Sequence, residues 1–227
     1  MSQQSSQLFW KFSNAFTKEL RDTIIKNLDS GNLKPAETVK RKEGTSKDAY
    51  ENKYIRDASI ATLENKDIND HISNMMTIAN KRAGWDFDIT VNEKMQFIKY
   101  KTEGHFRPHS DTSFQGPTAA FKWEDDLPND GFKVTRIEDA YLLGNVRKIS
   151  STLLLNDEFS GGGMSFYNMA ITNEEKENWT LGIEEIPLDL KAGDLIFFPS
   201  GVWHGVKPVT NGTRYALVTW FGGPPIK

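Results

Sequence analysis

Apolar positions in the first third of the chain recur with the spacing of an α-helix. One stripe repeats every fourth residue, which places its members on one helix face and predicts that this face is buried. Its members are Phe16, Leu20, Ile24 and Leu28. Asn14 stands where a helix N-cap is expected, and Gly31 follows the last apolar position. We therefore predict a helix between Asn14 and Gly31.

A second helical stripe falls between residues 67 and 82. Its members are Ile68, Ile72, Met75 and Ala79. Gly84 is the expected stop of this helix, because glycine readily adopts the left-handed backbone that ends many helices. Residues 32–53, between the two stripes, are polar and rich in lysine, which predicts an exposed loop.

After Gly84 the apolar pattern changes to short β-type segments separated by Gly, Asn, Asp and Pro. The expected strands are Trp85–Val91, Met95–Lys101, Lys133–Ile137, Lys148–Leu155, Gly163–Tyr167, Glu184–Leu190, Asp194–Phe198, Gly205–Pro208 and Arg214–Phe221. Asn211-Gly212 is a strong hairpin signal between the last two. Many short strands favour a sandwich or barrel, and helices that precede strands favour helices packed on one side of it.

We therefore expect one domain over residues 1–227, mainly β with N-terminal helices. Residues 1–84 are expected to be mainly helical support, and residues 85–223 to form the β core. Residues 112–146 read as a long insertion in that core, and long loops of compact domains are often lids or binding loops.

Composition excludes several function classes. The net charge is −3, so no global basic field attracts nucleic acid or an anionic membrane. There is no cysteine, which excludes disulfides, zinc–thiolate sites and iron–sulfur clusters and fits a reducing cytoplasm. No apolar run approaches the roughly 20 residues of a membrane span, and we expect neither a membrane partner nor a secretory signal.

The candidate chemistry lies in His109-Ser110-Asp111 and a distant His204. Residues i and i+2 of an extended segment share a face, and Pro108 favours an extended backbone here. Two imidazoles and one carboxylate form the facial triad of non-heme Fe(II) oxygenases. The alternative is that these are ordinary core or surface residues, since H-x-D alone is common.

Two further histidines compete less well for this role. His71 lies on the second predicted helix and reads as a surface or interhelix residue. His105 has no carboxylate two residues later, so we interpret it as structural or as support for a ligand.

Arg214 follows the expected hairpin, which would place it beside the strand of His204. A guanidinium there can form a bidentate pair with the carboxylate of a cosubstrate. A surface salt bridge is the alternative for a lone arginine.

Four segments together carry a family resemblance: YKTEGHFRPHSD, RKISSTLLLNDEFSGGGMSFYN, AGDLIFFPSGVWHGVKPVTNGTRYALVTW and, more weakly, ANKRAGWDFDI. Their order and spacing resemble the Fe(II)- and 2-oxoglutarate-dependent oxygenases, most closely the prolyl 4-hydroxylase-like branch, over roughly residues 54–223. The resemblance implies a double-stranded β-helix core, the jelly-roll of cupins.

The resemblance also implies roles for individual residues. It implies that His109, Asp111 and His204 bind Fe(II), that Arg214 binds the distal carboxylate of 2-oxoglutarate, and that Tyr100 lines the same pocket. Thr152 and Thr219 are further candidates for hydroxyl donors to this cosubstrate, and Trp220 is expected to pack at the end of the last strand.

Two features depart from the family pattern. Gly161-Gly162-Gly163-Met164 stands where Gly-Gly-Glu is frequent, so any role of that carboxylate is missing here. The glycines themselves predict a tight turn. The insertion, which carries Trp123, also looks longer than usual.

The implied reaction is hydroxylation of an unactivated C–H bond, with 2-oxoglutarate and O2 as cosubstrates and ascorbate as a further expected cofactor. A prolyl residue in a peptide or protein is the expected target. A small-molecule or free amino-acid hydroxylase, and a non-catalytic cupin-like metal-binding or sensor protein, remain as alternatives. Nucleic-acid demethylation fits the chemistry but not the acidic charge. The oligomeric state is not predicted.

Overall fold

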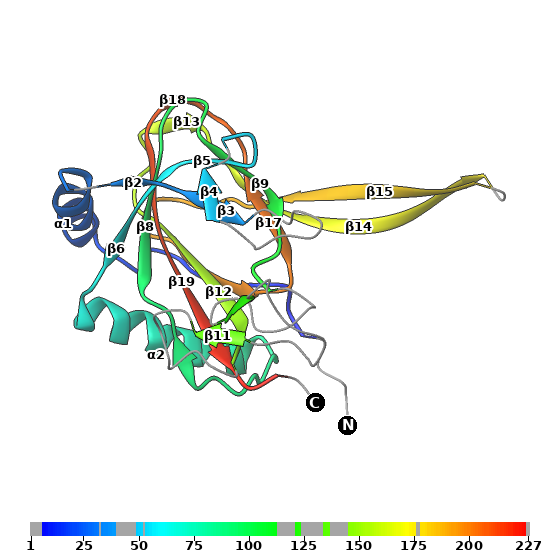
Figure 1. Cartoon of the computed structure of the whole chain (residues 1–227), viewed down its shortest axis with the longest axis horizontal. Helices are drawn as coiled ribbons and strands as arrows, with labels where there is room; N and C mark the ends of the chain where they lie inside the picture. Colours follow the sequence, from blue (N-terminus) through cyan, green and yellow to red (C-terminus); the bar gives the residue numbers. More distant parts are fainter. Residues whose placement is uncertain are drawn as a thin grey trace.

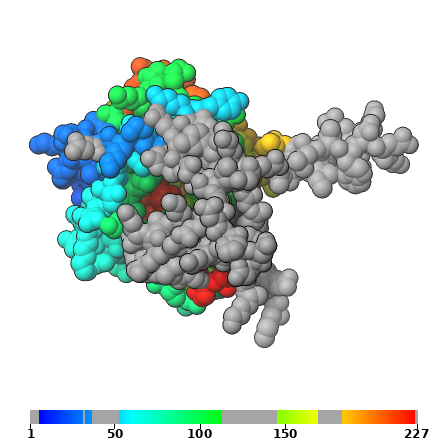
Figure 2. All heavy atoms as spheres, viewed as in Figure 1, coloured from blue at the N-terminus to red at the C-terminus, as the bar shows by residue number. Residues whose placement is uncertain are grey.

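The computed structural model describes residues 6–31, 33–39, 49–51, 53–112, 121–123, 134–136, 145–175 and 178–225. Two β-sheets face one another, and two helices lie on the outer side of the larger sheet (Figure 1). In the space-filling view the N-terminal part, blue to cyan, occupies one side of the molecule (Figure 2). Among the described residues, no helix has the length and apolar character needed to cross a membrane.

The larger sheet runs in the order β1-β16-β12-β19-β8-β6-β2, with β7 paired to β19. Its central strands, β12, β19 and β8, are antiparallel neighbours although they are distant in the sequence. The strands are β1 (Trp10–Phe12), β2 (Lys34–Pro35), β6 (Ser59–Leu63), β7 (Val91–Asn92), β8 (Met95–Tyr100), β12 (Val146–Leu154), β16 (Leu195–Pro199) and β19 (Arg214–Gly223).

The smaller sheet runs in the order β15-β14-β17-β9-β5. Its strands are β5 (Arg56–Asp57), β9 (His105–His109), β14 (Met164–Glu175), β15 (Asn178–Pro187) and β17 (Trp203–Val206). The β14–β15 hairpin extends well beyond the body of the molecule (Figure 1). Three two-stranded ribbons complete the β structure: β3 (Glu37–Val39) with β4 (Ala49–Glu51), β10 (Phe121–Trp123) with β11 (Val134–Arg136), and β13 (Phe159–Gly161) with β18 (Val209–Gly212).

Both predicted helices are present, as α1 (Lys18–Asp29) and α2 (Lys66–Arg82). The N-cap of α1 is Thr17 rather than Asn14, because the Thr17 hydroxyl accepts the backbone N–H of Leu20. Asn14 instead adopts a left-handed backbone with φ 51°. Leu20 is exposed, so the buried face of α1 is narrower than its apolar stripe. Gly84 follows α2 with φ 72°, as predicted.

The larger sheet separates two apolar regions by the parity of its residues. Odd-numbered residues face the helices, and this core includes Phe97, Leu153, Phe197 and Leu217. Even-numbered residues face the smaller sheet, and they include Ile98, Ile196, Phe198 and Val218. Strands β16, β12, β19 and β8 share this parity because, past the bulge at the start of β12, their register pairs odd residues with odd and even with even, as in Leu153↔Leu217. In β1 the parity is reversed, since Trp10 pairs with Phe197.

The structure corrects several expectations about elements. The first 84 residues are less helical than predicted, because β1, β2, β5 and β6 pair with strands of the two main sheets. Residues 85–90 are not a strand. Most of the expected insertion lies outside the described residues, and the side chain of Trp123 does too.

The hairpin predicted to bring Arg214 beside the strand of His204 is also wrong. β17 pairs with β14 and β9 in the smaller sheet, whereas β19 pairs with β12 and β8 in the larger one. Asn211-Gly212 belongs to β18, whose partner is β13. His204 and Arg214 therefore face one another from opposite sheets.

Asp194 fixes the N-terminal segment to the start of β16. Its carboxylate accepts the backbone N–H groups of Asn14 (3.0 Å) and Lys191 (3.1 Å) and pairs with Lys11 (3.3 Å). Burial alone would raise the pKa of Asp194, but these donors lower it below the ordinary 3.8.

We expect Asp194→Asn to lower the free energy of unfolding at neutral pH by about 1–3 kcal/mol, because buried donors lose a charged acceptor. The loss should shrink as the pH falls below about 3.8, because the carboxyl of the unfolded wild-type chain then binds a proton while the native carboxylate, whose pKa is lower, is still ionised. Urea unfolding across pH 3–7 measures this, with exposed Asp189→Asn as the matched control. Equal effects of the two variants would contradict the role of Asp194.

Candidate active site

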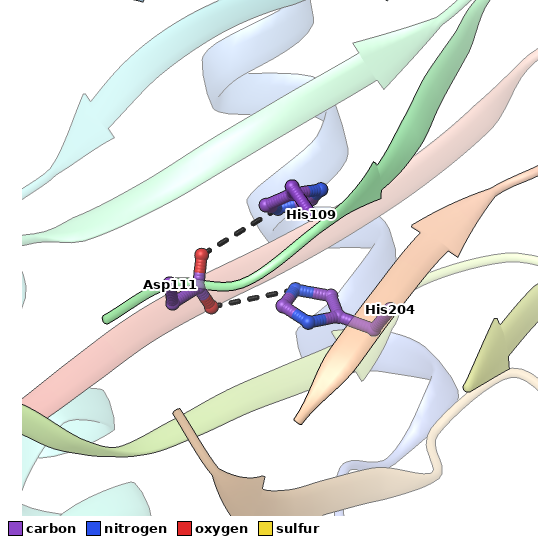
Figure 3. A group of neighbouring side chains, drawn as sticks. All are labelled: His109, Asp111 and His204. Atoms are coloured by element: carbon purple, nitrogen blue, oxygen red, sulfur yellow. Dashed lines mark ion pairs between the residues drawn. The ribbon is translucent and has the colours of Figure 1, made fainter. Parts of the chain in front are cut away.

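His109, Asp111 and His204 meet between the two sheets. His109 ends β9, His204 lies on β17, and the two are directly paired across the strands. Asp111 follows β9 by two residues, and its carboxylate lies 3.5 Å from Nε2 of His109 and 3.4 Å from Nε2 of His204 (Figure 3). The three ligand atoms lie within 4.8 Å of one another. This spacing suits one metal ion held by three groups on one side.

The imidazoles are oriented by the backbone. Nδ1 of His109 lies 2.8 Å from the carbonyl of Arg107, and Nδ1 of His204 lies 2.9 Å from that of Val202. A carbonyl can only accept, so each Nδ1 carries a proton, and Nε2 is the ring atom that each imidazole presents to Asp111 and could offer to a metal. Such support is typical of metal-binding histidines, and the residues present therefore fit a divalent ion.

The electrostatics of the triad favour an ionised carboxylate. Burial alone would raise the pKa of Asp111, but the two imidazoles hold it well below the usual range. Burial lowers the pKa of His109, more than its contact with Asp111 raises it. At His204 burial also lowers the pKa, but attraction to Asp111 outweighs it and the net shift is upward.

A chain of serine hydroxyls holds the Asp111 carboxylate. Oγ of Ser150, on β12, donates to Oδ2 of Asp111 at 2.7 Å and lies 2.9 Å from Oγ of Ser200. One hydroxyl has one proton, so Ser200 donates to Ser150 and Ser150 donates to Asp111. The carbonyl of Ser200 also accepts the backbone N–H of Asp111 at 3.0 Å. The sequence analysis missed both serines, because only the tertiary fold brings them to Asp111.

The triad opens onto a pocket that contains Arg214. Arg214 is 2% exposed, and its guanidinium lies 5.4 Å from the ring centroid of Tyr100, the residue opposite it on β8. No carboxylate lies within 4.0 Å of it in the described part of the chain. Burial without such a partner lowers the pKa of Arg214. An anionic ligand would therefore complete this site.

The other predicted pocket residues lie on opposite faces of the larger sheet, according to whether their numbers are even or odd. Thr152 lines the pocket, as do the apolar Ile98, Ala216 and Val218. Thr219 does not contribute its hydroxyl there, since an odd position faces the helices and Oγ1 donates to the carbonyl of Glu93. The prediction for Thr219 is corrected by this register.

Trp220 lines the pocket rather than only packing at a strand end. The guanidinium of Arg147 lies 4.1 Å from its ring centroid and is held by two bonds to Glu93, at 2.5 and 2.6 Å. This ion pair fixes the indole beside the metal centre.

The glycines before β14 form the tight turn that the sequence predicts. Gly161 and Gly162 have φ of 71° and 62°, and a Cβ at Gly161 would lie 2.5 Å from the carbonyl oxygen of Pro208. A Cβ at Gly162 would lie 3.2 Å from Cδ of Arg214, so this turn also leaves room for the arginine. Met164, in place of the frequent carboxylate, is a buried apolar wall of the pocket.

The remaining histidines lie elsewhere. His71 is an exposed residue of α2 whose ring meets that of Phe16 edge-on. His105 contacts the carbonyls of Glu103 and Tyr54 at the other end of β9. Within the described residues, the triad is the one cluster of acidic and imidazole groups with metal-binding geometry.

A three-ligand metal centre that shares a pocket with a buried cation, inside two facing sheets, defines a class of metal-dependent oxygenases. The sequence profile of the 2OG-Fe(II) oxygenase superfamily matches residues 95–222, more than half of the chain. The chain belongs to this superfamily. Membership implies Fe(II) and 2-oxoglutarate as the groups that this pocket would hold.

Curated relatives match over a short stretch. Two PKHD-type hydroxylases from Pseudomonas putida strains are 35% and 34% identical to this chain over 74 residues. The match covers 32% of this chain and 27% of each relative.

Solved structures extend the likeness to almost the whole chain. They include a prolyl-4-hydroxylase from Pseudomonas putida (17% identity, TM-score 0.56, 94% of this chain and 91% of that one). A prolyl hydroxylase from Trichoplax adhaerens, solved with a hypoxia inducible factor peptide fragment, shares 16% identity (TM-score 0.60, 94% and 83%). These similarities confirm the predicted jelly-roll fold.

We expect Ser150→Ala to weaken Zn(II) binding by about 10- to 100-fold, the usual effect of losing a group that orients a metal ligand. Titration of the metal-free protein with Zn(II) against a competing chelator measures this. Ser151→Ala is the matched control, because its hydroxyl donates to the carbonyl of Thr219 instead. Equal affinities of the two variants would exclude the positioning role of Ser150.

Proposed function

We propose that this protein is an Fe(II)- and 2-oxoglutarate-dependent dioxygenase that hydroxylates an unactivated C–H bond of a prolyl residue in a peptide or protein. The observation that carries the proposal is the pocket itself. One cavity contains an open His–Asp–His triad and a buried guanidinium that pairs with no carboxylate among the described residues. A simple metal-binding or sensor protein needs the triad but has no use for Arg214.

Each group of the chain has a defined task in this proposal. His109, Asp111 and His204 hold the metal by two neutral Nε2 atoms and one carboxylate, and Arg214 anchors the distal carboxylate of 2-oxoglutarate. Bound Fe(II) and 2-oxoglutarate supply the O2-dependent chemistry that yields succinate, CO2 and a hydroxylated product. The low pKa of Asp111 keeps its carboxylate ionised across the physiological range.

The residues that line the pocket also contribute to cosubstrate binding. Tyr100 and the apolar side chains around it exclude water, which strengthens the pairing of Arg214 with an anion. Thr152 is the remaining candidate hydroxyl donor to the cosubstrate. Ser150 contacts the metal ligand Asp111 and Trp220 lines the same pocket, so the target carbon would have to come close to these residues for a selective reaction.

The prolyl target is supported by the names of the relatives and structural neighbours, which are PKHD-type and prolyl hydroxylases. One neighbour was solved with a peptide, which favours a peptide or protein substrate here. Ascorbate dependence and a cytoplasmic location stay predictions.

The first test is to incubate the purified protein with Fe(II) and 2-oxoglutarate without O2, and then to admit O2. We expect a weak visible absorption of the metal–cosubstrate chelate, which bleaches as succinate forms. His109→Ala and His204→Ala should remove both signals, whereas the control His105→Ala should keep them. Full 2-oxoglutarate consumption by either first variant would contradict the metal assignment.

The same assay, followed by mass spectrometry on a panel of proline-containing peptides, tests the target. Peptide masses raised by one oxygen support the prolyl assignment. No hydroxylated peptide from an enzyme that still forms succinate would favour a small molecule. If the folded protein binds metal but shows neither the visible absorption nor succinate, the result would favour the sensor function.

We expect Arg214→Met to weaken 2-oxoglutarate binding by about 10- to 100-fold, because a charge-assisted pair with the distal carboxylate is lost. Calorimetry with the Zn(II)-loaded protein measures this without turnover. Arg107→Met is the control, since Arg107 is exposed and stacks on Tyr54. An unchanged affinity of Arg214→Met would exclude this anchor.

A further inference from the structure

A second guanidinium, that of Arg56, lines the same pocket. Arg56 lies on β5, the edge strand of the smaller sheet, opposite Phe106 of β9. Its side chain is only 9% exposed and reaches the cavity that holds the metal triad and Arg214. The established family chemistry needs one cationic anchor for its cosubstrate, and the pocket contains two cations.

The partners of Arg56 do not neutralise its charge. Nη2 donates to Oε1 of Gln96 at 3.2 Å, and the guanidinium lies 4.7 Å from the ring centroid of Phe106. Nε is buried without a hydrogen-bond partner, which is true of no other side-chain N or O atom in the described part of the chain. The described residues also place no carboxylate within ion-pair distance of it. A buried donor and charge left in this way cost free energy until an anion binds.

Arg56 and Arg214 lie at different places in the pocket. Gln96, the partner of Arg56, is four residues before Tyr100 on β8, and Tyr100 is opposite Arg214. Four residues of a strand span about 13 Å. Phe106, beneath Arg56, stacks on the imidazole of His109 with 3.6 Å between ring centroids. Arg56 is therefore close to the metal centre and displaced from the anchor of the cosubstrate.

A count of the charges in the filled pocket shows that Arg56 lacks a negative counter-charge. Fe(II) carries two positive charges and Arg214 one, whereas Asp111 carries one negative charge and 2-oxoglutarate two. These charges cancel, so Arg56 is left as one uncompensated positive charge in a buried place. Besides O2, which is neutral, the component still to enter is the compound that is hydroxylated.

We propose that Arg56 binds a carboxylate of the hydroxylated substrate and thereby selects substrates with an acidic group near the target carbon. This inference rests on the proposed function, because the charge count needs 2-oxoglutarate in the pocket. Nε and the N–H groups not used by Gln96 would donate to that carboxylate. Either an acidic side chain beside a prolyl residue or the carboxylate of a free amino acid offers this chemistry.

Calorimetry on the Zn(II)-loaded, 2-oxoglutarate-saturated protein tests the inference without turnover, since Zn(II) is redox-inert. One arm compares capped proline peptides that carry Glu or Gln beside the proline. The other arm compares free L-proline with L-prolinamide. We expect the carboxylate member of at least one pair to bind about tenfold more tightly in the wild type. The arm that shows this preference identifies the source of the carboxylate.

Two substitutions assign the preference to Arg56. Arg56→Gln should reduce it to about twofold or less, with 2-oxoglutarate affinity retained, and Arg56→Lys should keep part of it because the charge remains. Gln96→Leu is the control for a structural role, since it removes the hydrogen-bond partner of Arg56 and leaves the charge. This variant should keep the preference for the carboxylate.

Several outcomes would overturn the inference. The inference is overturned if the wild type shows no preference for the carboxylate ligand in either arm. It is also overturned if Arg56→Gln keeps the preference. Loss of 2-oxoglutarate affinity in Arg56→Gln would assign this arginine to the cosubstrate instead. If the wild type itself fails to bind 2-oxoglutarate, the proposed function is wrong and the charge count falls with it.

Discussion

The antiparallel register of the larger sheet decides which side chains reach the pocket. Its central strands pair even residues with even, so Tyr100, Thr152 and Arg214 all face the smaller sheet. A slip of one residue in β19 would turn Arg214 toward the helices and Thr219 toward the metal. The apolar odd positions resist this slip, because it would move Leu217 and Phe221 out of the core under α1 and α2 and turn the charged Arg214 into that core. The same strand register therefore both buries the apolar core under the helices and places Arg214 in the pocket.

Strand pairing in the smaller sheet likewise brings the metal ligands together. β9 and β17 bring His109 and His204 side by side, although 94 residues separate them in the chain. Asp111 follows on the same face and is tied through Ser150 to the larger sheet. The metal centre therefore bridges the two layers, and its geometry depends on their packing. Arg214 and Arg56 are buried cations that pair with no carboxylate in the described part of the chain, and anionic ligands are expected to complete both sites.

Membership in the 2OG-Fe(II) oxygenase superfamily fits this architecture, and the likeness of fold to the structural neighbours covers nearly the whole chain. Their identities are low enough that the neighbours show the fold and not the substrate. Met164, where a carboxylate is frequent, adds no negative charge to the pocket, and Arg56 adds a positive one. Both features favour the anionic substrate that we propose.

The sequence by itself determined those features that depend on residues close together in the chain. The helical spacing of apolar residues predicted both helices, the glycines before Met164 predicted a tight turn, and the H-x-D pattern with His204 predicted a group that the fold brings together. Tertiary structure alone decided that Arg214 and His204 belong to opposite sheets, that Thr219 faces the helices, and that Ser150 and Arg56 reach the pocket. The physical reason is that periodicity assigns alternate residues to two faces of a strand. Which face meets the metal depends on pairing with strands far away in the chain.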